Sequence, residues 1–150
     1  MQSAAQTKNI LRELFASQKL AVLATHNRNR SYASLVAFAA TKNLKTLVFA
    51  TTRATRKYAN LLQNPHVALL VDNRSNREAD FHQAIAVTAT GKAAPAAEKE
   101  EKRLQKLYLA KHPHLQEFVS ASSCELFKVE LDTYYLVSRF QNVVELHIQR

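Results

Sequence analysis

Three polar residues at the boundary between two predicted elements, Thr55, Arg56 and Lys57, carry side chains suited to an anionic group. A guanidinium can bind phosphate oxygens in pairs, an ammonium adds a compact charge, and a hydroxyl can cap a helix or bind a ligand oxygen. A helix N-terminus also attracts anions through its partial positive charge and free N–H groups. The triplet therefore predicts an anion site, and the alternative is a solvated basic turn.

The segment around this triplet alternates between strand and helix patterns. Residues 46–52 form an apolar, β-branched run, and residues 66–72 form a second one. Between them, Tyr58 and Leu61 recur at helical spacing, so one face of a short helix can pack inward. Pro65 ends that helix, because the residue before a proline is pushed out of the α region. The triplet thus lies at a predicted strand-to-helix junction.

Glycine is nearly absent, which restricts the kind of phosphate site that the chain can build. Gly91 is the single glycine. Glycine-rich phosphate loops, including the dinucleotide fingerprint and the P-loop, need several glycines for close backbone approach. They are therefore excluded, and a phosphate site must use side chains and a helix N-terminus.

The overall charge favours anionic partners. Lysine and arginine number 21 against 12 aspartates and glutamates, a formal net charge of +9. Such an excess suits a phosphorylated cofactor, an acidic metabolite or nucleic acid. The basic residues are scattered rather than clustered, which makes nucleic acid the weaker choice.

Length and composition predict one globular domain over residues 1–150. Hydrophobic residues make up 47% of the chain, enough for a sizeable core. Cys124 is the single cysteine, so disulfides within the chain and cysteine-based metal centres are excluded. No other metal-ligand cluster stands out, and no metal is predicted. The sequence shows neither a signal-peptide pattern nor an apolar run of membrane-spanning length, so a cytoplasmic protein is expected.

The remaining patterns predict a mainly β fold with a few peripheral helices. Asp132 is interpreted as a tight turn between two strands. Because most strand connections are short, we expect an antiparallel β-barrel. Further strands are expected at residues 19–26, 31–41, 81–94, 125–131, 133–138 and 143–148, and helices around residues 10–15, 96–111 and 115–119.

Three stretches together resemble a known family. They read LAVLATHN, SYASLVAFA and LVFATTRATRKYANLLQNPHVALLVD. This pattern is similar to that of the pyridoxamine 5'-phosphate oxidase-like family of split β-barrels, which bind flavin mononucleotide (FMN). The resemblance implies a single FMN-binding domain, a homodimer with FMN at the interface, and an oxidoreductase that acts on a small molecule.

The resemblance also implies which residues bind the cofactor. Arg56 and Lys57 match the family's phosphate-binding pair, and Thr55 the hydroxyl before it. Other positions match the strand segment facing the isoalloxazine edge, the strand end beside the flavin, and a glutamine near it. The implied cofactor-binding residues are Ser34, Leu35, Val36, Ala37, Ala50, Thr51, Thr55, Arg56, Lys57 and Gln83.

Departures from the family pattern leave the substrate open. The chain has no tryptophan, and the Arg-rich substrate motif of the true oxidase is missing from the C-terminal end, which offers Arg139 but no matching pattern. Oxidation of vitamin B6 is therefore not expected, and no catalytic acid or base is assigned. If the protein is an enzyme, the cofactor carries the chemistry.

Three alternatives remain beside the FMN reading. Related barrels use a deazaflavin or bind haem, and His112, His114 and His147 could ligate haem iron. Histidines that flank a proline break, such as Pro113, are more typical of exposed loops. The third alternative is a non-catalytic module that uses its positive charge to bind an anion or nucleic acid.

Overall fold

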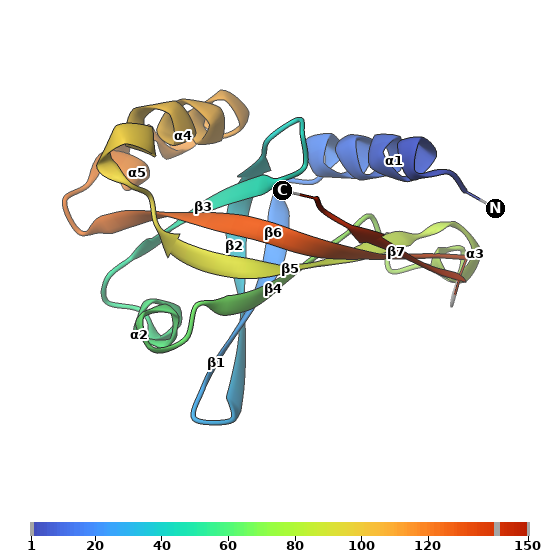
Figure 1. The fold of residues 1–150 in the computed structure, drawn as a ribbon, viewed down its shortest axis with the longest axis horizontal. Coiled ribbons are helices and arrows are strands. Elements are labelled where there is room, and N and C mark those ends of the chain that lie inside the picture. Colours follow the sequence, from blue (N-terminus) through green and yellow to red (C-terminus); the bar gives the residue numbers. More distant parts are fainter. Residues whose placement is uncertain (1, 140–141, 150) are drawn as a thin grey trace.

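A computed structural model describes residues 2–139 and 142–149 (Figure 1). Its strands form one antiparallel sheet in the order β3-β2-β1-β4-β5-β6-β7. The strands are β1 (Leu20–Asn27), β2 (Arg30–Ala40), β3 (Thr46–Thr52), β4 (His66–Asp72), β5 (Ile85–Pro95), β6 (Cys124–Ser138) and β7 (Asn142–His147).

The sheet closes into a barrel because its first strand in space also pairs with its sixth. β3 bonds to β2 on one side and to β6 on the other, from Thr46 opposite Glu130 to Thr52 opposite Cys124. Phe49 and Phe127 stack face to face across this closing pair, with ring centroids 5.4 Å apart. β7 continues the sheet beyond the barrel. The predicted mainly β fold, an antiparallel barrel with peripheral helices, is confirmed.

Alternate side chains of each strand point into the barrel and form the main core. The fully buried side chains include Leu23, Phe38, Leu69, Val87 and Tyr134. The Tyr134 hydroxyl donates a hydrogen bond of 2.8 Å to the Leu44 carbonyl, so its one polar group is satisfied inside the core.

Helices cover the barrel at several places. α1 (Ala4–Ser17) begins at a capping box, in which Ser3 and Gln6 exchange hydrogen bonds. α2 (Arg56–Gln63) follows β3, and α4 (Glu98–Lys111) is followed by a 3-10 turn η1 (Pro113–Leu115) and by α5 (Gln116–Ser120). A second apolar cluster lies outside the barrel, where Leu104 and Tyr108 of α4 pack on Ala39 and Val48.

One predicted turn is wrong. Asp132 does not separate two strands, because β6 runs unbroken from Cys124 to Ser138. The pairing with β5 shifts between Thr90 and Gly91, so Asp132 occupies a β-bulge, where it accepts a 2.7 Å hydrogen bond from the Thr90 hydroxyl. A Cβ at Gly91 would lie 2.2 Å from the Glu130 carbonyl oxygen, so this close approach of the two strands requires glycine.

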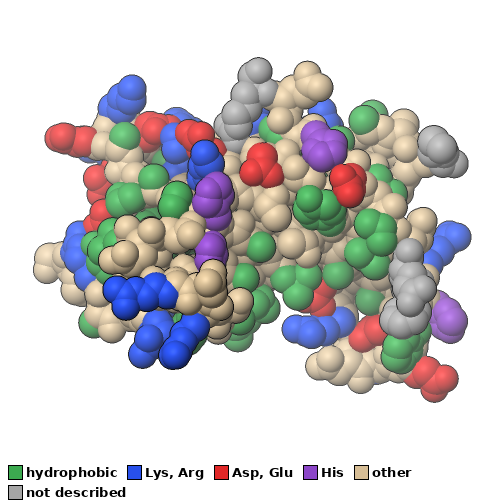
Figure 2. All heavy atoms as spheres, turned by 60° about the horizontal axis from the view of Figure 1, so that its bottom comes forward, with side chains coloured by type: hydrophobic (Ala, Val, Ile, Leu, Met, Phe, Trp, Pro, Cys, Tyr) green, Lys and Arg blue, Asp and Glu red, His purple; other side chains and the backbone are tan. Residues whose placement is uncertain are grey.

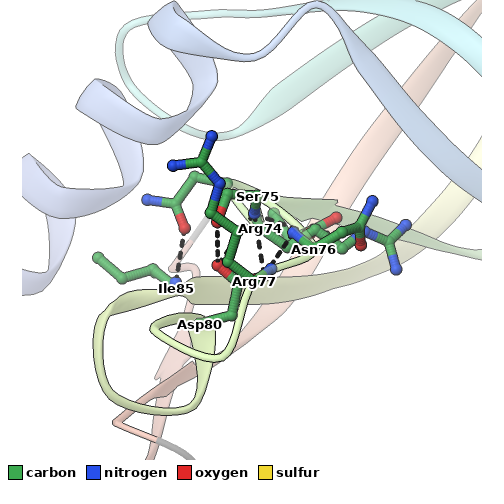
Figure 3. A network of polar contacts seen from close by, with 8 residues as sticks. Arg74, Ser75, Asn76, Arg77, Asp80 and Ile85 are labelled. Carbon is green, nitrogen blue, oxygen red and sulfur yellow. Dashed lines mark hydrogen bonds and ion pairs between the residues drawn. The ribbon is translucent and has the colours of Figure 1, made fainter.

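The strand predicted from residue 81 also begins later than expected. Phe81 and Gln83 belong to a short helix, α3 (Asp80–Gln83), and β5 starts at Ile85. The Asp80 carboxylate explains the difference, because it accepts hydrogen bonds from the backbone N–H groups of Ser75, Asn76 and Arg77 (Figure 3). This folds residues 75–80 into a compact loop that ends in a helical turn.

Candidate functional site

The N-terminus of α2 is fixed by a hydroxyl network centred on Thr55. The Thr55 hydroxyl oxygen accepts a 3.2 Å hydrogen bond from the Tyr58 N–H, and the hydroxyl donates to the Thr52 carbonyl at 3.0 Å. The Thr51 hydroxyl lies 3.0 Å from it. Thr55 is therefore a helix cap whose hydrogen-bonding capacity is used within the protein. Binding a ligand oxygen would require exchange of one of these bonds.

Arg56 and Lys57 begin the helix with positive charge that nothing offsets. Within the described residues, neither side chain makes an ion pair or a hydrogen bond, whereas nearby Arg53 is engaged by the Glu125 carboxylate and the Ser122 carbonyl. The first turn of α2 contains no acidic residue. Cations in a first turn oppose the helix dipole. A bound anion would relieve this conflict and satisfy the free N–H groups as well.

A surface hollow of about 370 Å³ lies beside this helix start. It joins β2, the end of β3 and the start of α2 on one side to the helices α4, η1 and α5 on the other. Its lining residues are Leu35, Val36, Ala37, Ala50, Thr51, Thr52, Thr55, Lys57, Tyr108, Leu115 and Phe118. Most residues that the family resemblance implied are thus brought together at one place.

The helical wall of the hollow was not foreseen as part of a site. Tyr108, Leu115 and Phe118 come from three consecutive elements more than fifty residues after the basic triplet. Sequence patterns predicted the helices correctly but not the strands on which they pack. Tyr108 is 1% exposed, and burial raises the pKa of its phenol to about 12, so the phenol stays protonated at neutral pH.

Ser34 lies next to the hollow on β2, one residue before Leu35. Its hydroxyl oxygen is buried and lacks a hydrogen-bond partner among the described residues. Ser34 lies on the same face of β2 as the core residues Val36 and Phe38, so its hydroxyl points into the barrel and does not line the hollow. Leu35 itself is 65% exposed, which leaves a large apolar side chain at the rim.

Gln83 does not join the other implied residues within one chain. It ends α3, which lies at the opposite end of the sheet from α2 and α5 (Figure 1). The side chain is exposed. The structure therefore does not bring Gln83 to the hollow within one chain.

The histidines do not line the hollow, and one of them differs from its predicted setting. His114 and His147 are exposed, but His112 is only 1% exposed and its Nε2 lies 2.8 Å from the Phe38 carbonyl oxygen. The prediction of an exposed loop histidine at position 112 is wrong. Leu104, Tyr108 and His112 recur every four residues, and this spacing was the signal that could have revealed the buried face.

Two further properties bear on the site. Among the described residues, no group of three or more His, Cys, Asp or Glu side chains is arranged to hold a metal ion. The helices within residues 2–139 and 142–149 are all too short or too polar to cross a membrane.

Comparison with known proteins supports the family assignment. The family model described as pyridoxamine 5'-phosphate oxidase matches residues 8–138. No curated protein matches the sequence. The closed antiparallel barrel, together with the hollow beside the basic start of α2, places the chain in the class of split-barrel proteins. By the extent of the family match, the chain belongs to the pyridoxamine 5'-phosphate oxidase-like family, as its motifs indicated.

Solved structures share this fold at low sequence identity. The heme binding protein from Mycobacterium smegmatis has a TM-score of 0.84 at 17% identity; the match covers 98% of this chain but only 59% of that protein. General Stress Protein 26 from Bacillus anthracis has a TM-score of 0.71 at 19% identity, covering 95% and 98% of the two chains. A FAD-binding protein from Mesorhizobium loti has a TM-score of 0.69 at 12% identity, covering 90% and 94%.

Proposed function

We propose that the protein binds FMN in the hollow and acts as an oxidoreductase on a small molecule. The observation that carries the proposal is the pairing of uncompensated positive charge at the start of α2 with an apolar hollow directly beside it. A phosphate group needs the first feature, and a flat ring system needs the second. Arg56 and Lys57 supply the charge, and Leu35, Ala37 and Phe118 supply apolar lining.

The residues present fit this cofactor. Arg56, Lys57 and the free N–H groups of α2 would hold the phosphate. The backbone of Ser34–Ala37 and the end of β3 at Ala50 and Thr51 would face the ring. The bound flavin would supply hydride or electron transfer, which side chains do not provide.

The chain's own residues bind and enclose rather than catalyse. Lys57 and Tyr108 are the titratable groups in the described lining of the hollow. Because its pKa is raised to about 12, the Tyr108 phenol can donate a hydrogen bond but does not serve as a base. Leu115 and Phe118 form an apolar wall on one side of the hollow, against which a planar ring can pack.

A homodimer completes the proposed site. Val22, Ala24, Ala68 and Leu70 alternate with fully buried residues along β1 and β4, so their side chains lie on the outer face of the barrel and stay half-exposed. This uncharged outer face adjoins the exposed Leu35 through the pairing of Val22 with Leu35. A second copy docked on this face would cover the hollow and could bring its own Gln83 to the flavin.

Haem is the second candidate, because the similar Mycobacterium smegmatis protein is described as heme binding. In this chain the hollow has no histidine among its described lining residues, and the Nε2 of His112 already binds the Phe38 carbonyl. Nucleic acid is less favoured still. On the face in Figure 2, Lys and Arg side chains occur in separate groups, interrupted by acidic and uncharged ones.

Flavin titration tests the proposal. Purified protein, freed of any cofactor, is titrated into FMN, and quenching of flavin fluorescence gives the affinity. Removing two charge-assisted hydrogen bonds in the Arg56→Ala, Lys57→Ala double variant should weaken binding by about a hundredfold or more. Riboflavin, which lacks the phosphate, should bind the wild-type protein and the variant with similar, weak affinity.

The matched control is the Arg28→Ala, Arg30→Ala double variant, which removes the same charge from the exposed turn between β1 and β2. Its FMN affinity should stay near the wild-type value. Equal losses in both double variants would indicate non-specific attraction and contradict the site. Parallel titrations with haemin and a deazaflavin decide between the cofactors, and a Soret shift with no flavin quenching would favour haem.

A further inference from the structure

Lys111, the last residue of α4, ties this helix to two other elements. Its ammonium donates a 2.6 Å hydrogen bond to the Phe15 carbonyl in the last turn of α1. The same ammonium lies 3.8 Å from the centroid of the Phe38 ring on β2. The C-terminal end of a helix is partially negative and an aromatic face attracts cations, so both contacts favour this position.

His112 adds a second tie at the next residue. Its Nε2 lies 2.8 Å from the Phe38 carbonyl oxygen. A carbonyl can only accept, so Nε2 carries the proton and neutral His112 leaves Nδ1 unprotonated. Nδ1 makes no hydrogen bond within the described residues. Its ring also packs against that of Tyr108, with centroids 5.1 Å apart.

Lys111 and His112 together fix the end of α4, and the helical wall of the hollow begins at the next residue. Pro113 follows directly and starts η1, and Leu115 and Phe118 then line the hollow. Within the described residues, η1 and α5 make few polar contacts with the barrel. The Cys124 N–H binds the Ala121 carbonyl after α5, and the Arg53 guanidinium binds the Ser122 carbonyl. The Arg53 N–H also binds the Ser123 carbonyl at 2.9 Å, and Leu115 and Phe118 pack on the second apolar cluster. Lys111 and His112 therefore fix the start of the wall, and its far end is held by Arg53 and by apolar packing.

The charges around His112 are all positive or become so in acid. They are Lys111 on α4, His114 on η1 and Lys19 before β1. Among the described residues, the Phe38 carbonyl is the one polar group whose contact with the ring favours the protonated form. Burial and these cations lower the pKa of His112 below its ordinary value of 6.5. Protonation would place a second buried cation beside Lys111 and add an N–H at Nδ1 that needs a new acceptor.

We propose that Lys111 and His112 are positioning residues that latch η1 and α5 over the hollow, and that protonation of His112 releases the latch. In the released state the wall formed by Leu115 and Phe118 moves away from β2, and the hollow opens. The effect on a bound cofactor rests on the proposed flavin site. The latch itself does not, because it is defined by contacts within the chain.

The sign of the pH dependence follows from linkage. A histidine whose pKa is lowered in the latched state takes up its proton on release, so acid favours release. Between the ordinary pKa and the lowered one, each pH unit downward favours release by about tenfold. Above pH 6.5 His112 is neutral in both states and no longer favours release. Burial lowers the pKa of Lys111 to about 8, so its own titration is centred above the pH values at which the latch is tested.

Hydrogen–deuterium exchange of the ligand-free wild-type protein tests the latch directly. Exchange is measured at pH 7.5 and at pH 5.5 and corrected for the intrinsic rate at each pH. Amides of residues 112–120 should lose protection by up to about tenfold in acid, while amides of β1 and β5 stay protected. Equal change in this segment and in the barrel strands would overturn the proposal.

Two variants separate titration from mere packing. In His112→Gln the side-chain amide can still donate to the Phe38 carbonyl but cannot titrate, so protection of residues 112–120 should no longer depend on pH. His114→Gln, at the exposed neighbour, should keep most of the wild-type pH dependence, because His114 contributes less than burial to the His112 shift. Circular dichroism confirms that each variant is folded. Persistence of the full pH dependence in folded His112→Gln would contradict the assignment to His112.

FMN affinity measured at the same two pH values adds the functional consequence. The FMN phosphate itself takes up a proton at about pH 6, so both proteins should bind FMN more weakly at pH 5.5. The loss should be larger in the wild-type protein than in His112→Gln. If FMN does not bind at all, the exchange result still decides on the latch. If exchange shows no latch while FMN binds at the hollow, only the latch is lost.

Discussion

Two regions of this molecule gather groups that attract anions, and they differ in how those groups are satisfied. In residues 75–80, backbone N–H groups converge on the Asp80 carboxylate at 2.7 to 3.3 Å (Figure 3). At the start of α2, the helix N-terminus meets Arg56 and Lys57 with no acidic residue in its first turn, and the neighbouring Glu125 carboxylate is engaged by Arg53. The first region supplies its own anion, and in the second Arg56 and Lys57 have no acidic partner among the described residues.

This difference indicates which of the two regions is able to bind an anionic ligand. The Asp80 loop is a closed structural unit, and its hydrogen bonds lower the pKa of the carboxyl group, led by the Ser75 N–H. An anion from solution would have to displace that carboxylate. The α2 start pays a small electrostatic cost in the absence of a ligand. Uncompensated charge beside a hollow is thus the more informative signal for binding.

The largest expected effect comes from giving α2 a carboxylate of its own. Arg56→Glu should weaken FMN binding by about a hundredfold or more, because a charge-assisted bond is lost and a repulsion is added. The same change should raise the free energy of unfolding by about 0.3–1 kcal/mol, because an acid in the first turn suits the helix dipole. Fluorescence titration and chemical denaturation measure the two effects. Loss of both affinity and stability would mean that Arg56 is structural.

A smaller effect is expected at the helix cap. Thr55→Ala should lower the free energy of unfolding by about 1 kcal/mol, because the Tyr58 N–H and the Thr52 carbonyl lose their partner. Thr55→Ser keeps the hydroxyl and serves as the control. Denaturant melts give the stability of each. FMN affinity should fall less than in Arg56→Glu, and the reverse order would show that the hydroxyl binds the ligand.

A variant at Gln83 tests whether a residue beside the Asp80 loop contributes to the proposed site at the start of α2. Gln83→Ala should leave the free energy of unfolding within about 0.5 kcal/mol of wild type, because the side chain is exposed. FMN affinity should fall by up to about tenfold if a second copy brings this amide to the flavin. Gln63→Ala, an exposed glutamine at the end of α2, is the matched control. Unchanged affinity would remove Gln83 from the site.

The smallest effect at neutral pH is expected in the Asp80 loop. A carboxyl group with a lowered pKa contributes stability above its unfolded-state pKa, near 3.8, and loses this contribution as the pH falls through the lowered value. Asp80→Asn should therefore lower the melting temperature slightly at pH 7, and the difference should vanish near about pH 2. Thermal melts across this range measure it. A difference that persists in acid would mean that charge is not the cause.

Local sequence patterns predicted most of the fold. They failed where the same pattern is compatible with two different local structures. A polar residue between two strand-like runs marks either a turn or a bulge, and only the partner strand decides. At Asp132 the decision came from Gly91, forty-one residues earlier, whose missing side chain lets β5 approach the bulge. Phe81 likewise fits a strand, but the Asp80 carboxylate gathers the preceding loop and imposes a helical turn.

The candidate site was predictable on one side only. Residues from β2, β3 and α2 lie within thirty positions of one another, and family motifs cover them. The opposite wall, from Tyr108 to Phe118, depends on how α4 packs on Ala39 and Val48, which no local pattern encodes. His112 shows the same limit, because its burial follows from contacts with Phe38 on a distant strand.

The pairing of β3 with β6 has a consequence for solubility. An open sheet in this strand order would present the backbone of β3 as a long edge, ready to pair with another molecule. Closure satisfies that edge along seven residue pairs, from Thr46 to Thr52. β7 then forms the outer edge of the sheet, and this strand carries the polar side chains of Glu145 and His147. Closure of the barrel therefore removes one of the two edges at which another strand could pair.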